Sequence, residues 1–170
     1  MGWRSAQTVT GSSPDYDGGL REWNTDTTQL DETLATKTGP NGVTSVAVCP
    51  DATIVAAGHA DGAVELWDPS TRKQLPGSPL HGHTGTVLGV ASGVAHQLAS
   101  GGMDDLRLWD TATGQPTAAP EAVSDIVTSV AVSPDGRLTG WSTTDGTVRV
   151  SPAIADPTQL CDKLPTNMSH

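Results

Sequence analysis

The sequence has few aromatic residues. Its 170 residues include no phenylalanine, one tyrosine and five tryptophans, so aromatic side chains make up 4% of the chain. A core must therefore be built from valine, leucine, alanine and isoleucine with a few indole rings. Nineteen glycines and twelve prolines accompany them, which favours many short strands joined by tight turns. Helical periodicity is also missing, and the predicted fold class is all-β.

Basic residues are scarce as well. Nine lysines and arginines stand against 19 aspartates and glutamates, which gives a formal net charge of −10. Nucleic acids and anionic membrane surfaces both need cations to neutralise their phosphates, so neither is an expected partner. The acidic excess favours solubility instead.

Cysteines, long apolar runs and nucleotide-binding motifs are rare or missing. Cys49 and Cys161 lie far apart without CxxC spacing, and we interpret them as free thiols in a reducing compartment. No stretch reaches the about 18 apolar residues of a membrane span, and the N-terminal residues lack the apolar run of a signal peptide. We therefore expect a cytoplasmic chain. Without GxGxxG or GxxxxGK[ST] motifs, no nucleotide or other cofactor is expected.

A repeat of about 42 residues organises the chain. Four segments contain an aspartate turn followed by a strand, at residues 17–24, 61–68, 104–110 and 145–151. Placing these segments in register gives spacings of 44, 42 and 42 residues between Trp23, Trp67, Trp109 and Ser151. Each repeat is predicted to contain three strands joined by tight turns, and a looser fourth strand.

The predicted strands differ in their expected burial. Residues 43–48 and 127–132 both read Val-Thr-Ser-Val-Ala-Val, and such small and β-branched strands are expected to be covered on both faces. In residues 64–67 a charge alternates with apolar residues, which predicts one wetter face. His59 and His96 fall in predicted loops and are expected to be solvated.

Two Trp-Asp pairs and one Gly-His pair indicate a family. Trp67-Asp68 and Trp109-Asp110 end their strands, and Gly82-His83 opens the third repeat. With its period, the chain resembles the WD-repeat β-propeller family over roughly residues 5–158. The resemblance implies an incomplete ring of about 3.5 four-stranded blades. The implied units are a partial first repeat at 1–36, repeats at 37–80, 81–121 and 122–158, and a C-terminal tail at 159–170. The tail resembles the C-terminal extension of actinobacterial WD-repeat signalling proteins.

The resemblance also implies a structural hydrogen-bond set in the third repeat. Its members are His83, Ser100, Asp104 and Trp109, and a buried indole N–H and imidazole do need such partners. Further repeat-framework residues are Asp17, Trp23, Asp61, Trp67 and Asp145. The second repeat has Ala57 at the serine position, and the fourth has Trp141 at the serine position and Ser151 at the tryptophan position.

The number of repeats is too small for a closed ring, because propellers close with about four to eight blades. Three explanations stay open at this point. The chain is a piece of a longer propeller, two copies form a homodimer that completes one ring of about seven blades, or the chain stands alone as an open stack with bare strand edges.

Several histidines and aspartates could be catalytic or bind a metal, but we interpret them as structural residues of loops and turns. His81 and His83 flank a glycine as two zinc ligands would, but no cysteine and no carboxylate triad accompanies them. The aspartates that could form a catalytic pair or a Ca²⁺ site are Asp51, Asp61, Asp104, Asp105, Asp135 and Asp145. They recur at turn positions, which turn chemistry alone explains. We expect no catalytic, cofactor-binding or metal residues. Trp3 and Trp141 either fill space between blades or anchor an interface.

The sequence therefore predicts a non-catalytic protein-interaction scaffold, part of or derived from a bacterial signalling protein. One rim is expected to gather loops 39–42, 81–85 and 121–125 with turns 60–62, 102–105 and 144–146. The acidic Asp104, Asp105, Glu121 and Asp125 favour a protein or peptide partner that is basic. The alternatives are a propeller enzyme with a metal site in its channel, and a remnant without independent function.

Overall fold

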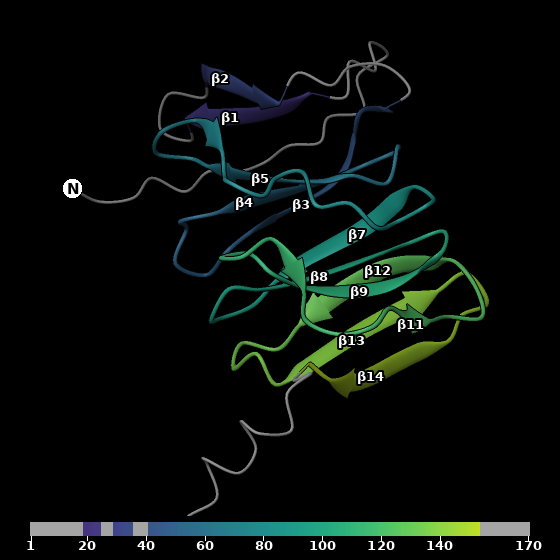
Figure 1. Cartoon of the computed structure of the whole chain (residues 1–170). Coiled ribbons are helices and arrows are strands. Elements are labelled where there is room, and N and C mark those ends of the chain that lie inside the picture. The colour runs from purple at the N-terminus through teal and green to yellow at the C-terminus, as the bar shows by residue number, and fades with distance from the viewer. Residues whose placement is uncertain (1–18, 25–28, 36–40, 154–170) are drawn as a thin grey trace, which may run out of the picture.

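The computed structural model describes residues 19–24, 29–35 and 41–153, and these form four antiparallel sheets. Figure 1 shows the sheets side by side, following one another in chain order. The all-β prediction is confirmed, since every regular element of the described residues is a strand. No helix in this part of the chain has the length and apolar character needed to cross a membrane.

The second and third sheets have all four strands of the predicted repeat, and in the third the outermost strand is formed by two short pieces. The first sheet contains β1 (Leu20–Asn24) and β2 (Gln29–Ala35). The second contains β3 (Val43–Val48), β4 (Val55–His59), β5 (Val64–Asp68) and β6 (Lys73–Gln74). The third contains β7 (Val87–Ser92), β8 (Gln97–Gly102), β9 (Asp105–Asp110), β10 (Gln115–Pro116) and β11 (Glu121–Ala122). The fourth contains β12 (Val127–Val132), β13 (Leu138–Thr143) and β14 (Val148–Pro152).

The outer strand is broken into two short pieces in the second and third sheets. In the second sheet β6 pairs with β5, and Leu80 forms a separate bridge to Val64. In the third sheet β10 and β11 both pair with β9, at its two ends. This broken edge is the looser fourth strand that the repeat pattern predicts.

A β-bulge recurs in the innermost strand of three sheets. The register with the next strand shifts after Val43, after Val87 and after Val127. In the second sheet the extra residue is Thr44, whose Oγ1 donates to the carbonyl oxygen of Gly58 at 3.0 Å and also to that of Val87 in the next sheet. A bulge bends its strand, and here it also aims a hydroxyl at the neighbouring sheet.

Three apolar clusters form the core, one between each pair of successive sheets. Leu20 packs with Val55 and Ala57 between the first and second sheets. The largest cluster lies between the second and third sheets and contains Leu66 and Trp109 among others. Leu106, Val127 and Trp141 pack between the third and fourth. The sheets are therefore stacked face to face as the blades of an incomplete ring.

Two predictions about burial are wrong. The strands at 43–48 and 127–132 are only partly buried. They are the innermost strands β3 and β12 of their sheets, and both contact β7 of the sheet between them. The wetter face predicted for residues 64–67 is dry instead, since Glu65 is 4% exposed. The most buried strand of the second sheet is β4, between two covering sheets.

Candidate functional site: a buried hydrogen-bond network and the rim above it

The third sheet brings His83, Ser100, Asp104 and Trp109 together. His83 lies in the loop before β7, Ser100 in β8, Asp104 in the turn between β8 and β9, and Trp109 in β9. The indole Nε1 of Trp109 donates to Ser100 Oγ at 2.8 Å, and Ser100 Oγ lies 2.7 Å from Nε2 of His83. Nδ1 of His83 lies 2.7 Å from Asp104 Oδ1.

These contacts form one directed chain of hydrogen bonds. If Nδ1 of His83 carries the ring proton, it donates to the carboxylate of Asp104, and Nε2 is free to accept the proton of Ser100. Ser100 in turn accepts from the indole of Trp109. Because His83, Ser100 and Trp109 are buried, each polar atom of the chain would otherwise lack a partner.

The carboxylate of Asp104 connects these hydrogen-bonded side chains to the backbone of the entry loop. Its Oδ2 accepts from the backbone N–H of Thr84 at 2.6 Å. Partial burial raises the pKa of Asp104, but the hydrogen bonds from Thr84 and His83 outweigh it and hold the pKa below its ordinary value. Asp104 therefore stays charged at neutral pH and fixes the entry loop to the turn.

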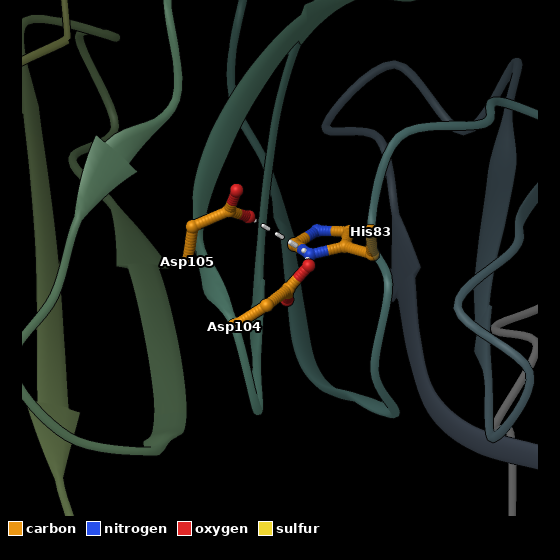
Figure 2. Close-up of side chains that lie close together, drawn as sticks. All are labelled: His83, Asp104 and Asp105. Carbon is orange, nitrogen blue, oxygen red and sulfur yellow. Dashed lines mark hydrogen bonds and ion pairs between the residues drawn. The ribbon is translucent and has the colours of Figure 1, made fainter.

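Figure 2 shows a second carboxylate on the same imidazole. Asp105 Oδ1 lies 3.1 Å from Nδ1 of His83, and the two carboxylate oxygens also accept from Nε and Nη2 of Arg107 at 2.9 and 2.8 Å. His83, Asp104 and Asp105 stand close enough to be considered as metal ligands. However, both ring nitrogens and both Asp105 oxygens already have protein partners, as expected of a structural network.

A different set occupies the equivalent place in the second sheet. His59 is fully buried, with Nδ1 3.2 Å from the carbonyl oxygen of Asn41 and Nε2 3.3 Å from Glu65 Oε2. Glu65 Oε2 also accepts from Nε1 of Trp67 at 3.2 Å. The expectation of a solvated His59 is wrong. The sequence did contain a signal for a buried polar group here. Glu65 lies two residues before Trp67, so its carboxylate lies on the same face of the strand as the indole.

In the fourth sheet the serine and tryptophan positions are exchanged. Trp141 pairs with Arg149, as Ser100 pairs with Arg107 in the third sheet. Trp141 is 4% exposed and packs against Leu106, so it fills space between two sheets. Its Nε1 and the Oγ1 of Thr139 are buried and have no hydrogen-bond partner in the part of the chain that the structure describes. Trp3, the other candidate, lies outside the described residues.

The other predicted framework residues serve turns and strands. Asp61 Oδ1 accepts from the N–H of Ala63 at 3.1 Å, and Asp145 Oδ1 accepts from that of Thr147 at 2.9 Å. Trp23 pairs with Leu30 along the backbone of the first sheet, and Asp17 lies outside the described residues. Asp51 and Asp135 make the same turn contact, with the N–H of Thr53 and of Arg137.

A rim of connected loops lies beside the network. One backbone hydrogen bond recurs in three sheets between the entry loop and the turn after the second strand: from Ala60 to Gly42 at 3.2 Å, from Met103 to Thr86 at 3.1 Å and from Thr144 to Ile126 at 3.0 Å. Thr86 Oγ1 also donates to the carbonyl oxygen of Ala60 in the preceding sheet at 3.0 Å. The rim is thus a braced surface, from which Met103 projects with 55% exposure.

The opposite rim contains a small pocket of about 120 Å³, whose lining includes Cys49, Asp51 and His96. Burial raises the pKa of the Cys49 thiol, more than its hydrogen bond with Ser92 lowers it. Nucleophilic catalysis needs the thiolate, which a raised pKa disfavours. Cys49 is therefore a packing residue of the second sheet rather than a reactive group.

Acid should destabilise the chain once the pH falls below about 4. Asp104 has a lower pKa when folded than when unfolded. Its charged form therefore contributes stability above the unfolded value, about 3.9, and this contribution is lost as the pH falls through the folded value. We expect the Tm, measured from about pH 7 to 2, to fall below about pH 4. Asp104→Asn should weaken that dependence, and an unchanged pH profile in this variant would contradict the prediction.

Comparisons with known proteins place the repeats. The family model described as "WD domain, G-beta repeat" matches residues 31–68 and 117–150. WD repeat-containing protein 75 of Xenopus laevis is 28% identical over 118 residues, 67% of this chain and 14% of that protein. Coronin-7 of Pongo abelii is 32% identical over 110 residues, 57% of this chain and 11% of that protein. The chain thus spans only a small part of these curated relatives.

Solved structures share the arrangement of sheets. A chain in the crystal structure of the mitotic checkpoint complex superposes with a TM-score of 0.71 at 21% identity, over 79% of this chain and 42% of that one. The computationally designed Ika4 protein superposes with a TM-score of 0.67 at 25% identity, over 81% of each chain. These likenesses confirm the predicted fold, a propeller of four-stranded blades in an incomplete ring.

Proposed function

Because this chain belongs to the WD-repeat family, we propose that it is a non-catalytic scaffold that binds a protein or peptide at the rim. The observation that carries the proposal is Met103, an exposed apolar side chain on a surface braced by hydrogen bonds. A flexible, polarizable side chain on a rigid support suits a protein contact.

The charge around Met103 favours a basic partner. Asp61 and Asp145 are exposed on turns of this rim, and the hydrogen bonds from Thr143 and Thr147 hold the pKa of Asp145 below its ordinary value. Asp105 contributes less than its sequence position suggests, because the guanidinium of Arg107 compensates its charge. A peptide with lysine or arginine beside an apolar anchor therefore matches the rim best.

The setting of the scaffold follows from two further observations. The free, buried thiol of Cys49 supports a reducing compartment, and we propose the cytoplasm. The resemblance of the tail at 159–170 supports a bacterial signalling protein as the parent, and that tail lies outside the described residues. We propose no catalytic role, since the described turn aspartates are held by backbone hydrogen bonds and Cys49 is disfavoured as a thiolate.

Binding can be tested with fluorescent peptides rich in lysine and arginine that contain one leucine or tryptophan. We expect saturable binding to the full chain that weakens with salt, and no binding of the charge-reversed peptides. Met103→Ala should weaken binding about five- to tenfold, the effect of losing a contact of about 1 kcal/mol or more. Val94→Ala is the matched control, because Val94 is exposed on the opposite rim.

Two results would refute the rim as the binding surface. One is equal binding of the basic and the charge-reversed peptides. The other is an equal loss of affinity in Met103→Ala and Val94→Ala.

A further inference from the structure

The fourth sheet stands at one end of the row of described sheets, and an exposed linker joins it to the third (Figure 1). Residues 117–122 of this linker are all exposed. Ala122 ends β11 and still pairs with the third sheet, whereas Asp125 Oδ1 already accepts a hydrogen bond from Thr144 Oγ1 of the fourth at 2.7 Å. The chain therefore passes from one sheet to the other at residues 123–124.

Hydrogen bonds from side chains fix the third sheet to the second. At the β-bulge of β3, Thr44 Oγ1 donates to the carbonyl oxygen of Val87. The next residue, Ser45, accepts through Oγ from the N–H of Val90 at 3.1 Å. Two hydroxyls of the third sheet also donate to carbonyl oxygens of the second, Ser92 to Val48 at 2.8 Å and Thr86 to Ala60 at 3.0 Å. Four such hydrogen bonds therefore cross this junction.

None of these bonds has a counterpart between the third and fourth sheets. The equivalent positions have all lost their hydroxyl groups. They are Leu88 and Gly89 in the third sheet, in place of Thr44 and Ser45, and Ile126 and Val132 in the fourth, in place of Thr86 and Ser92. Within the described residues, no hydrogen bond or ion pair joins the third sheet to the fourth.

Buried polar groups weaken the same junction further. Thr139 and Trp141 lie two residues apart on β13, so both side chains face the third sheet, where Trp141 packs against Leu106. Trp141 Nε1, Thr139 Oγ1 and, beside Gly136, Oε1 of Gln97 on β8 are buried and have no hydrogen-bond partner in the described part of the chain. Opening the junction would hydrate these atoms and relieve the cost of their burial.

The apolar cluster at this junction is also the smaller one. Ten buried residues form the cluster between the second and third sheets, and three form the cluster between the third and fourth. Apolar burial is the dominant force that holds stacked sheets together. All three terms, apolar burial, hydrogen bonding and desolvation, therefore make the junction of the third and fourth sheets the weaker of the two.

We propose that the fourth sheet is a separately opening unit, which swings away from the third sheet about a hinge at residues 123–124 while the second and third sheets stay folded. Such sub-global openings occur where one structural unit is held less firmly than the rest. Opening exposes Leu106 of the third sheet, which Val127 and Trp141 cover in the closed state. This inference does not depend on the peptide-binding rim.

Native-state hydrogen exchange of the full chain, followed by NMR at increasing urea concentrations, tests the proposal. We expect the amides of β12, β13 and β14 to share one opening free energy and one urea dependence, both lower than those of β4 and β8. Their protection should be at least about tenfold lower, because each missing hydrogen bond is worth about fivefold in an equilibrium.

Two exchange patterns would overturn the proposal. The first is a single transition shared by β4, β8 and β13, because all the sheets would then open together. The second is protection that decreases gradually from β12 to β14 with β12 as protected as β8, because it would show fraying of an edge strand and no release of a whole sheet.

Leu88→Thr should hold the junction more tightly. Threonine occupies this bulge position in β3 and β12, and the new hydroxyl would donate to the carbonyl oxygen of Val127 as Thr44 donates to that of Val87. We expect about fivefold higher protection of β12, β13 and β14 relative to β4. Val148→Thr is the matched control, since Val148 is 73% exposed on the same sheet, and it should leave β12 and β13 unchanged. No gain in Leu88→Thr, or an equal gain in both variants, would overturn the proposal.

Discussion

Replacing Gly102 with alanine should lower the free energy of unfolding by about 3 kcal/mol or more, as severe overpacking does. A Cβ at this position would collide with the carbonyl oxygen of Thr86 and lie 3.0 Å from its carbonyl carbon and from Val87 Cα. These are backbone atoms at the paired ends of β7 and β8, where Val87 faces Gly102. They cannot turn aside as a side chain could, so the strands must separate. Urea denaturation followed by circular dichroism measures the effect.

Gly140→Ala is the control, because this glycine lies in open surroundings. A Cβ there would meet nothing closer than the carbonyl oxygen of Arg149 at 3.6 Å. Ala56 and Ala99 occupy the equivalent positions of the second and third sheets. We expect a change within about 1 kcal/mol, in the stabilising direction, because alanine has less freedom in the unfolded chain. A Gly140→Ala variant as unstable as Gly102→Ala would contradict this account. If Gly102→Ala is not obtained folded, Gly101→Ala tests overpacking against the side chain of Val127 instead, whose Cγ1 would lie 2.5 Å from the new Cβ.

Replacing Ser100 with alanine should cost about 3 kcal/mol of stability, because two buried groups lose their partner at once. Ser100 Oγ accepts from Nε1 of Trp109 and lies 2.7 Å from Nε2 of His83. Each unsatisfied group costs about 1–3 kcal/mol. Thermal and urea unfolding of the variant, under the same buffer conditions as the wild type, give the difference.

Thr139→Val is the matched comparison in the next sheet. Thr139 is 1% exposed, and its hydroxyl has no hydrogen-bond partner among the described residues. Valine has a similar shape, so the substitution removes a buried polar atom without removing a hydrogen bond. We expect an equal or higher stability. The same contrast holds for the indoles, since Trp109→Phe removes a hydrogen bond and Trp141→Phe removes none. A Thr139→Val variant that loses as much stability as Ser100→Ala would show that the network is not the cause.

The sequence predicted the parts of this fold that depend on local chemistry. The spacing of Trp67 and Trp109 placed the third strand of two sheets, and the Asp-Gly pairs placed the turns between strands. The fold class follows from the same pattern, because alternation with a period of two and turn residues at regular intervals are properties of short segments.

Burial could not be predicted in the same way. A charge at Glu65 indicates a wet face by its pattern, yet the face is covered by a neighbouring sheet, and the carboxylate accepts a hydrogen bond from Trp67 and lies 3.3 Å from Nε2 of His59. Leu138, Val148 and Val150 show the converse, since their residue types indicate a covered face and the structure leaves it exposed. Both outcomes depend on which sheet lies alongside.

From its residues alone this chain was bound to form short twisted strands with turns about every ten residues, because backbone preferences act between near neighbours in the chain. Only the stacking of whole sheets decided that Glu65 would be buried, that the indole of Trp141 would be left without a hydrogen-bond partner among the described residues, and that Val148 and Val150 would be exposed. Those outcomes arise from contacts between residues distant in sequence, and their free energy depends on the shape of both surfaces at once.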